Sequence, residues 1–129
     1  MSLFLKLDGV LGESRVPEHI GEIELLSFKF NDQSPSPFAY GGGGSQGKLI
    51  FKEAHFKKLQ DTISPNLWKF CADGKIFPLA IVTVLSDKDK KLSLTYSLTE
   101  AIITSIQTSG DKEEMISLNF NAMTQQYRD

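Results

Sequence analysis

At 129 residues, the chain has the ordinary size of one domain and is long enough to bury a core without disulfides or metals. Lys and Arg number 14 against 16 Asp and Glu, so the net charge of −2 excludes the broad positive field of proteins that bind nucleic acid or anionic lipid. The 40% of apolar residues and 23% of charged residues exclude a disordered chain, and the single cysteine, Cys71, excludes an intrachain disulfide.

The N-terminal segment predicts a strand without an export signal before it. Residues 3–7 alternate leucines with other side chains, and Asp8-Gly9 is a turn pair that ends the alternation. The sequence has no basic segment leading into a long apolar one, and no run of the about 20 apolar residues that span a membrane. We therefore expect synthesis in the cytoplasm, no cleavable signal peptide and no membrane insertion.

A second strand is predicted over residues 22–30. Ile23 and Leu25 fall on one face of this strand, and Phe28 and Phe30 fall on the other. The alternation stops where Ser, Pro and Gly become frequent, which ends the strand.

The next segment, residues 31–47, is predicted to be a long, flexible, glycine-rich loop, called the arm below. Its last part, Gly42 to Lys48, has the spacing of a phosphate-binding P-loop, so a small nucleotide-binding enzyme is one alternative. However, Leu49 stands where the P-loop needs a hydroxyl that reaches the metal. The following residues are also typical of a strand, whereas a P-loop must open a helix. The pattern therefore favours an arm between two strands.

A third strand is predicted from Lys48 to Lys57, with a bulge near Glu53 where the alternation slips. A helix follows over residues 64–74. Ser64 is predicted to cap it, Pro65 suits a first turn, and Gly74 suits the left-handed residue at a helix C-terminus.

Three more strands are predicted in the C-terminal half. The first runs from Leu79 to Leu85 and is apolar enough to be buried on both faces. The second starts near Leu92, continues to Ile106 and bends near Thr99-Glu100. The last runs from Met115 to Tyr127.

Six strands and one helix have too few crossovers for a parallel sheet. The short polar connections favour antiparallel neighbours instead. We therefore predict one mainly β (α+β) domain over residues 1–129, an antiparallel β-barrel of two packed sheets with one short side helix.

Catalytic and metal sites are not expected. His19 and His55 are far apart in sequence, and neither has a zinc-ligand spacing. Cys71 falls on the apolar side of the predicted helix, where a cysteine packs as a small hydrophobe. The acidic residues of the early loop and second strand are typical of a solvated face. The residues predict neither an enzyme nor a bound cofactor.

The order and spacing of several motifs resemble one known family, from Leu3 to about Tyr127. The chain is similar to the haemolysin-coregulated protein (Hcp) family of type VI secretion systems. The motifs are Gly12-Glu13-Ser14, His19, Ile23-Glu24-Leu25-Leu26-Ser27, the glycine run into Gly47-Lys48-Leu49, Ser64-Pro65-Asn66-Leu67 and Gly74-Lys75.

The resemblance implies a structural function. Hcp proteins form compact β-barrels that assemble head-to-tail into hexameric rings, and the rings stack into the inner tube of a contractile injection machine. The implied partners are further copies of the chain, a spike protein, a contractile sheath and small effectors carried in the lumen. The tube protein is itself secreted. The arm matches the loop that contacts stacked rings, and its implied assembly residues are Phe38, Tyr40, Gly41, Gly42, Gly43, Gly44 and Gly47.

The sequence departs from the family pattern at its C-terminus. The family usually continues past the equivalents of Gln126-Tyr127 into another strand, whereas this sequence stops at Asp129. The alternative function is therefore an Hcp-like binding or chaperone module for secreted effectors, expected if the shorter C-terminus prevents rings.

Overall fold

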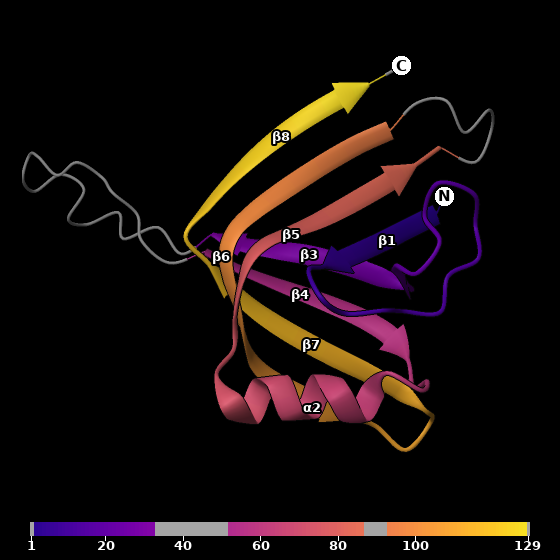
Figure 1. Ribbon diagram of the computed structural model, residues 1–129, viewed down its shortest axis with the longest axis vertical. Coiled ribbons are helices and arrows are strands. Elements are labelled where there is room, and N and C mark those ends of the chain that lie inside the picture. Colours follow the sequence, from indigo (N-terminus) through magenta and orange to yellow (C-terminus); the bar gives the residue numbers. More distant parts are fainter. Residues whose placement is uncertain (1, 33–51, 87–92, 129) are drawn as a thin grey trace, which may run out of the picture.

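A computed structural model of the chain describes residues 2–32, 52–86 and 93–128 (Figure 1). These residues form eight strands and one helix. The elements are β1 (Ser2–Leu7), β2 (Ile23–Leu25), β3 (Ser27–Asp32), β4 (Lys52–Leu59), α2 (Ser64–Asp73), β5 (Ile76–Leu85), β6 (Ser93–Thr108), β7 (Glu113–Phe120) and β8 (Ala122–Arg128).

The strands form one antiparallel sheet in the order β2-β1-β5-β6-β7-β4-β3, with β8 paired to β6. The 16-residue strand β6 carries two partners on one edge, β8 along its first half and β7 along its second. Its other edge pairs with β5. The fold is thus mainly antiparallel β with one short helix, as the sequence predicts. The prediction of two packed sheets is wrong for the described residues, because all their strands belong to one bent sheet.

The sheet bends along a line that crosses three neighbouring strands. On β6, Glu100 has a φ of 54°, in the left-handed region, which confirms the bend predicted there. Pro78 lies opposite Glu100 in β5, where the ladder skips one pair. Asn121 separates β7 from β8 and donates its backbone N–H to the oxygen of Thr99 at 2.9 Å. In Figure 1, β7 and β8 diverge from this corner like the arms of a V.

The core lies on the concave side of this bend. Buried side chains from β1, β4, β5, β6 and β7 share it with Ile63 and Leu67, which lie just before and within α2. Phe70 of α2 meets the buried Phe77 of β5 edge to face, with ring centroids 5.7 Å apart. The helix therefore covers one end of the core, and Cys71 lies on the side that packs against it, as the sequence predicts.

Aromatic side chains from opposite parts of the sheet join across this core. Phe28 and Phe30 of β3 pack against Tyr96 of β6, with ring centroids 5.8 and 4.9 Å apart. Phe30 also meets Phe120 of β7 at 6.2 Å. Strands that lie far apart in the sheet order thus contact each other through their side chains.

The start of α2 differs from the prediction. The N-cap is Ile63, and no side chain caps the helix there. Ser64 instead directs its Oγ to Glu114 of β7, at 3.0 Å, and accepts a hydrogen bond from the backbone N–H of Asp61. At the other end, Gly74 has a φ of 67° and caps the helix in the left-handed conformation, as predicted.

Two predicted strands are each divided in two. The segment 22–30 becomes β2 and β3, because β2 pairs with β1 whereas β3 pairs with β4. At the break, the backbone N–H of Leu26 bonds the oxygen of Lys57. The segment 115–127 is divided by the sheet corner at Asn121.

Smaller corrections concern the third and fourth predicted strands. No bulge lies near Glu53, since β4 pairs with β3 and β7 without a register shift. The strand predicted to start at Leu79 starts at Ile76, so Pro78 lies within β5. Residues 79–85 are not fully buried on both faces as predicted, because Leu79 is 40% exposed.

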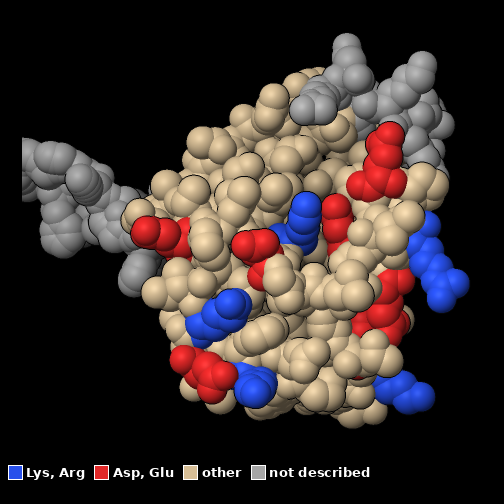
Figure 2. All heavy atoms as spheres, in the orientation of Figure 1, with Lys and Arg blue, Asp and Glu red and all other residues tan. Residues whose placement is uncertain are grey.

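The surface charges are mixed. On the face seen in Figure 2, acidic and basic side chains are interspersed, and neither sign forms a broad field.

Candidate functional site

The residues predicted to mediate assembly lie outside the described part of the chain. They are Phe38, Tyr40, Gly41, Gly42, Gly43, Gly44 and Gly47. The strands that flank this segment are described: Asp32 at the end of β3 pairs with Lys52 at the start of β4. The predicted loop boundary is therefore wrong at its first two residues, since residues 31–32 belong to β3.

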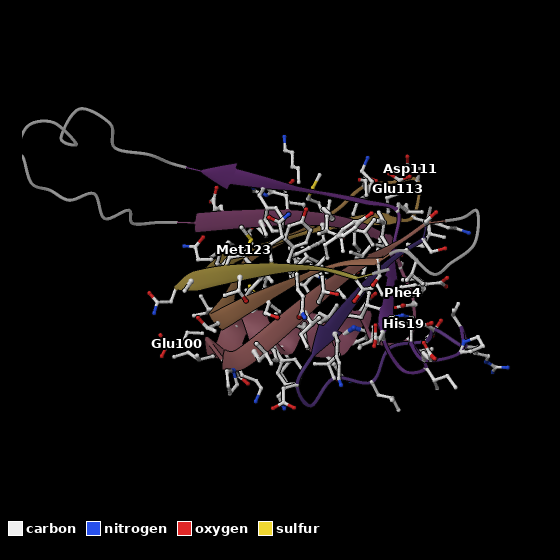
Figure 3. The ribbon with its side chains drawn as sticks, turned by 90° about the horizontal axis from the view of Figure 1, so that it is seen from above. Phe4, His19, Glu100, Asp111, Glu113 and Met123 are labelled. Carbon is white, nitrogen blue, oxygen red and sulfur yellow. The ribbon has the colours of Figure 1, made fainter. Side chains whose placement is uncertain are left out.

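Strand β8 leaves apolar side chains uncovered. Met123 and Tyr127 lie opposite Leu98 and Leu94 of β6, and residues directly opposite in an antiparallel pair project to the same face. Leu98 is fully buried, yet Met123 is 37% and Tyr127 is 64% exposed. Among the described strands, β8 pairs only with β6, so its second edge has no partner there. Figure 3 shows Met123 on this strand.

Strands β2 and β3 form the two ends of the described sheet. They are consecutive in the chain, and only Leu26 separates them. One continuous segment therefore carries the two terminal strands, and Leu26 between them is 47% exposed. Among the described strands, β8 is thus the one whose free edge does not belong to this connecting segment, and another chain can add a strand there.

The loop that precedes β2 is held firmly against the sheet. His19 stacks on Phe4 of β1 with ring centroids 4.5 Å apart and planes within 2°, and its Nδ1 lies 2.9 Å from Glu22 Oε1 (Figure 3). Gly12 approaches the loop's return segment so closely that a Cβ there would lie 2.5 Å from the backbone oxygen of Glu22. Its N–H bonds the oxygen of Gly21. The motif residues Gly12 and His19 thus have structural functions.

Lys58 of β4 is at the centre of a buried polar cluster, called the Lys58 cluster below. Its Nζ donates to Asp61 Oδ1 at 2.9 Å and to Glu114 Oε1 at 3.2 Å. Lys58 and Glu114 are 1% and 3% exposed. Ser64, the first residue of α2, completes the cluster through Glu114. These bonds join β4, β7 and the start of the helix.

The Lys58 cluster cannot be read from spacing alone. Lys58 and Glu114 are separated by 56 residues, and only strand pairing brings them together. The alternation of β4 is the one available signal, since Ala54 and Phe56 place Lys58 on the buried face.

A second polar contact lies on the opposite face of the same strands. His55 Nδ1 is 2.8 Å from Ser117 Oγ, and His55 Nε2 is 3.5 Å from Glu53 Oε1. His55 and Ser117 are direct cross-strand partners on β4 and β7. The sequence does not predict this pair, because 62 residues separate His55 from Ser117.

Glu13 joins the early loop to the turn before α2. Its Oε2 accepts hydrogen bonds from the hydroxyl and the backbone N–H of Thr62. These two bonds lower the pKa of Glu13 below its usual value, because they favour the ionised carboxylate.

The other candidate residues have structural surroundings. Cys71 is partly buried and packs against the core, as predicted. In residues 2–32, 52–86 and 93–128, no three His, Cys, Asp or Glu side chains are placed to share a metal ion. No helix in these ranges is long and apolar enough to cross a membrane.

Known proteins share both the sequence and the fold. A family described as "Type VI secretion system effector, Hcp" matches residues 4–127. Protein hcp1 of Pseudomonas aeruginosa is 29% identical over 135 residues, which cover 99% of this chain and 83% of that protein.

Solved structures give the same result. Hcp1 from Salmonella typhimurium is 33% identical with a TM-score of 0.79, and the match covers 98% of this chain and 85% of that one. Hcp2 from the same organism is 32% identical with a TM-score of 0.76, covering 98% and 86%. The chain therefore belongs to the Hcp family of type VI secretion system effectors, whose members are secreted, β-rich structural proteins and not enzymes.

Proposed function

We propose that this protein is a subunit of the inner tube of a type VI secretion system. In this function, six copies assemble head-to-tail into a ring, and rings stack into a tube that carries effectors and is expelled with them. The protein is made in the bacterial cytoplasm and leaves the cell with the tube. The protein acts through the geometry of its assembly.

The uncovered face and free edge of β8 carry this proposal. Tyr127 is 64% exposed on the same sheet face as the core residue Leu98. An apolar side chain at such a position is stabilised when another chain covers it. A ring also needs a heterologous contact, in which one surface meets a different surface on the next copy.

Within one subunit, we propose that the sheet closes into a single barrel domain over residues 1–129. The segment of β2 and β3 supports this closure, because it pairs with β1 at one end and with β4 at the other. The aromatic contacts between Phe28, Phe30 and Tyr96 support it further. A rigid closed subunit gives a ring a fixed angle between neighbours.

We assign the contact between stacked rings to the arm, with Phe38 and Tyr40 as anchors and glycines 41–44 and 47 as the hinge. Glycine-rich backbone loses much conformational entropy on ordering, so the contact forms only when a second ring supplies enough buried surface. A spike protein, a contractile sheath and small effectors are the remaining proposed partners.

The proposal is tested by Tyr127→Lys. We expect the purified wild-type chain to have a mass about six times its 14.4 kDa by light scattering over a concentration series. A lysine on the uncovered face of β8 should shift the mass toward the monomer, because the neighbouring copy would have to bury its charge.

The matched control is Thr124→Lys, which places the same charge on the other face of β8. This variant should keep the wild-type mass. A wild-type chain that stays monomeric at every concentration would reject the tube and leave the binding or chaperone module as the function. Equal effects of both lysines would reject the assignment to this face.

A further inference from the structure

Four of the exposed large apolar side chains gather around two adjoining hollows beside β2. The first hollow, of about 350 Å³, is lined by Leu26 and Leu59. The second, of about 530 Å³, is lined by Leu11 and Ile20. The two hollows share Glu13 and Ser14 on their walls. Exposed fractions of the four apolar side chains are 80% for Leu11, 73% for Ile20, 47% for Leu26 and 54% for Leu59.

The walls of this surface, called the paired hollow below, are fixed in position. Backbone hydrogen bonds join Gly12 to Gly21 at 2.6 Å and Ser14 to the oxygen of Glu22 at 3.0 Å. Glu13 is bound by Thr62 of the turn before α2. Exposed apolar groups on a fixed surface bind a partner with little loss of conformational entropy.

The charges of the first hollow are predominantly negative. Glu13, Glu24 and Asp61 line it, and Lys and Arg are absent from its described lining. Arg15 lines the second hollow, so the two hollows together carry three carboxylates against one guanidinium. Asp61 shares Lys58 with Glu114, so this buried lysine faces two carboxylates and leaves net negative charge beside the hollow. The hydrogen bonds from Thr62 lower the pKa of Glu13, which favours its ionised carboxylate.

We propose that the paired hollow binds a short segment of another protein in which apolar side chains alternate with Lys or Arg. The cations of the segment face Glu13 and Glu24. Its apolar side chains cover the four exposed apolar residues of the paired hollow, Leu11, Ile20, Leu26 and Leu59. Charge complementarity selects this segment over an acidic or purely apolar one. This interaction is separate from the β8 contact proposed for ring closure.

Three blocked, fluorescently labelled peptides test the proposal on the 129-residue protein. The probe is Leu-Lys-Leu-Arg-Leu. One control, Ser-Lys-Ser-Arg-Ser, keeps its charge, and the other, Leu-Gln-Leu-Gln-Leu, keeps its apolar side chains. We expect saturable binding of the probe by fluorescence anisotropy, at least about tenfold tighter than either control.

Substitutions locate the binding. The double variant Leu26→Ser/Leu59→Ser and the single variant Glu24→Lys should each weaken probe binding by about tenfold or more. The control Leu79→Ser removes a comparably exposed leucine outside the paired hollow and should bind like wild type. Equal affinity for all three peptides, or equal binding by all variants, would overturn the proposal.

Light scattering on the same variants separates this proposal from the tube. If Leu26→Ser/Leu59→Ser dissociates the ring and the wild-type ring does not bind the probe, the paired hollow is a contact between copies and the proposal fails. If the wild-type chain is monomeric but binds the probe as described, the tube proposal fails and this one holds.

Discussion

At the scale of single residues, the Lys58 cluster has the largest expected effect on stability. Lys58→Met removes the cation that pairs with the buried carboxylate of Glu114. Leaving a buried charge unpaired costs about 3–5 kcal/mol, so the free energy of unfolding should fall by about that much. Urea unfolding monitored by circular dichroism measures this change in the free energy of unfolding.

The neighbouring residue provides a matched control. Lys57 also pairs with a glutamate, Glu113, but at 3.6 Å and with both side chains more than a third exposed. Lys57→Met should therefore change stability by less than about 1 kcal/mol. Similar losses in the two variants would show that Lys58 is not a buried, coupled charge.

The Glu13 carboxylate should make the stability of the folded chain depend on pH. Its pKa is lower in the folded chain than in the unfolded one, because Thr62 donates two hydrogen bonds to the ionised form. This contribution to stability is therefore complete above the unfolded pKa and is lost as the pH falls through the folded pKa. Glu13→Gln should lower the unfolding temperature at pH 7, and the difference from wild type should vanish in acid.

A thermal unfolding series from pH 7 down to about pH 2 measures this effect. Glu24→Gln, which neutralises another exposed carboxylate of the same hollow, is the control and should follow the wild-type profile more closely. A constant difference between Glu13→Gln and wild type across the series would contradict the linkage to ionisation.

At the scale of elements, the sheet corner depends on one residue with a positive φ. Glu100 adopts the left-handed region at 54° within β6. A β-branched residue is strained there, so Glu100→Val should destabilise the chain by about 1–3 kcal/mol. Glu100→Gly should be neutral or stabilising, because glycine adopts this region without strain.

Lys29→Val is the corresponding control on β3, where the backbone is ordinary strand. We expect a change within about 0.5 kcal/mol at this exposed position. Chemical unfolding of the three variants gives the comparison. If Val is tolerated equally at positions 29 and 100, the corner is not set by the backbone of Glu100.

At the scale of the whole molecule, the arm should contribute to assembly more than to folding. Deleting residues 38–44 removes the proposed anchors Phe38 and Tyr40, but shortening a loop changes its closure entropy only slightly. We expect an unchanged unfolding midpoint and intact rings that stack less by electron microscopy. A collapse of thermal stability would place the arm in the core and reject its assignment to stacking.

Local signals in the sequence determined much of the fold. The alternation of residues 3–7, the first-turn proline and glycine cap of α2, and the bend near Glu100 were all predictable, because each depends on neighbouring residues. The family was also predictable, from motifs in a fixed order. The predicted assembly residues remain predictions, since they lie outside the described residues.

Only the tertiary structure decided which strands pair and which side chains stay uncovered. Two predicted strands are divided. The two halves that meet at Leu26 pair with different strands, and the two that meet at Asn121 pair with different parts of β6. The alternation of apolar residues does not indicate where each half pairs. Lys58 meets Glu114, and Glu13 meets Thr62, across long stretches of chain. The exposure of Tyr127 and the paired hollow depend on packing between distant segments, which a local pattern cannot specify.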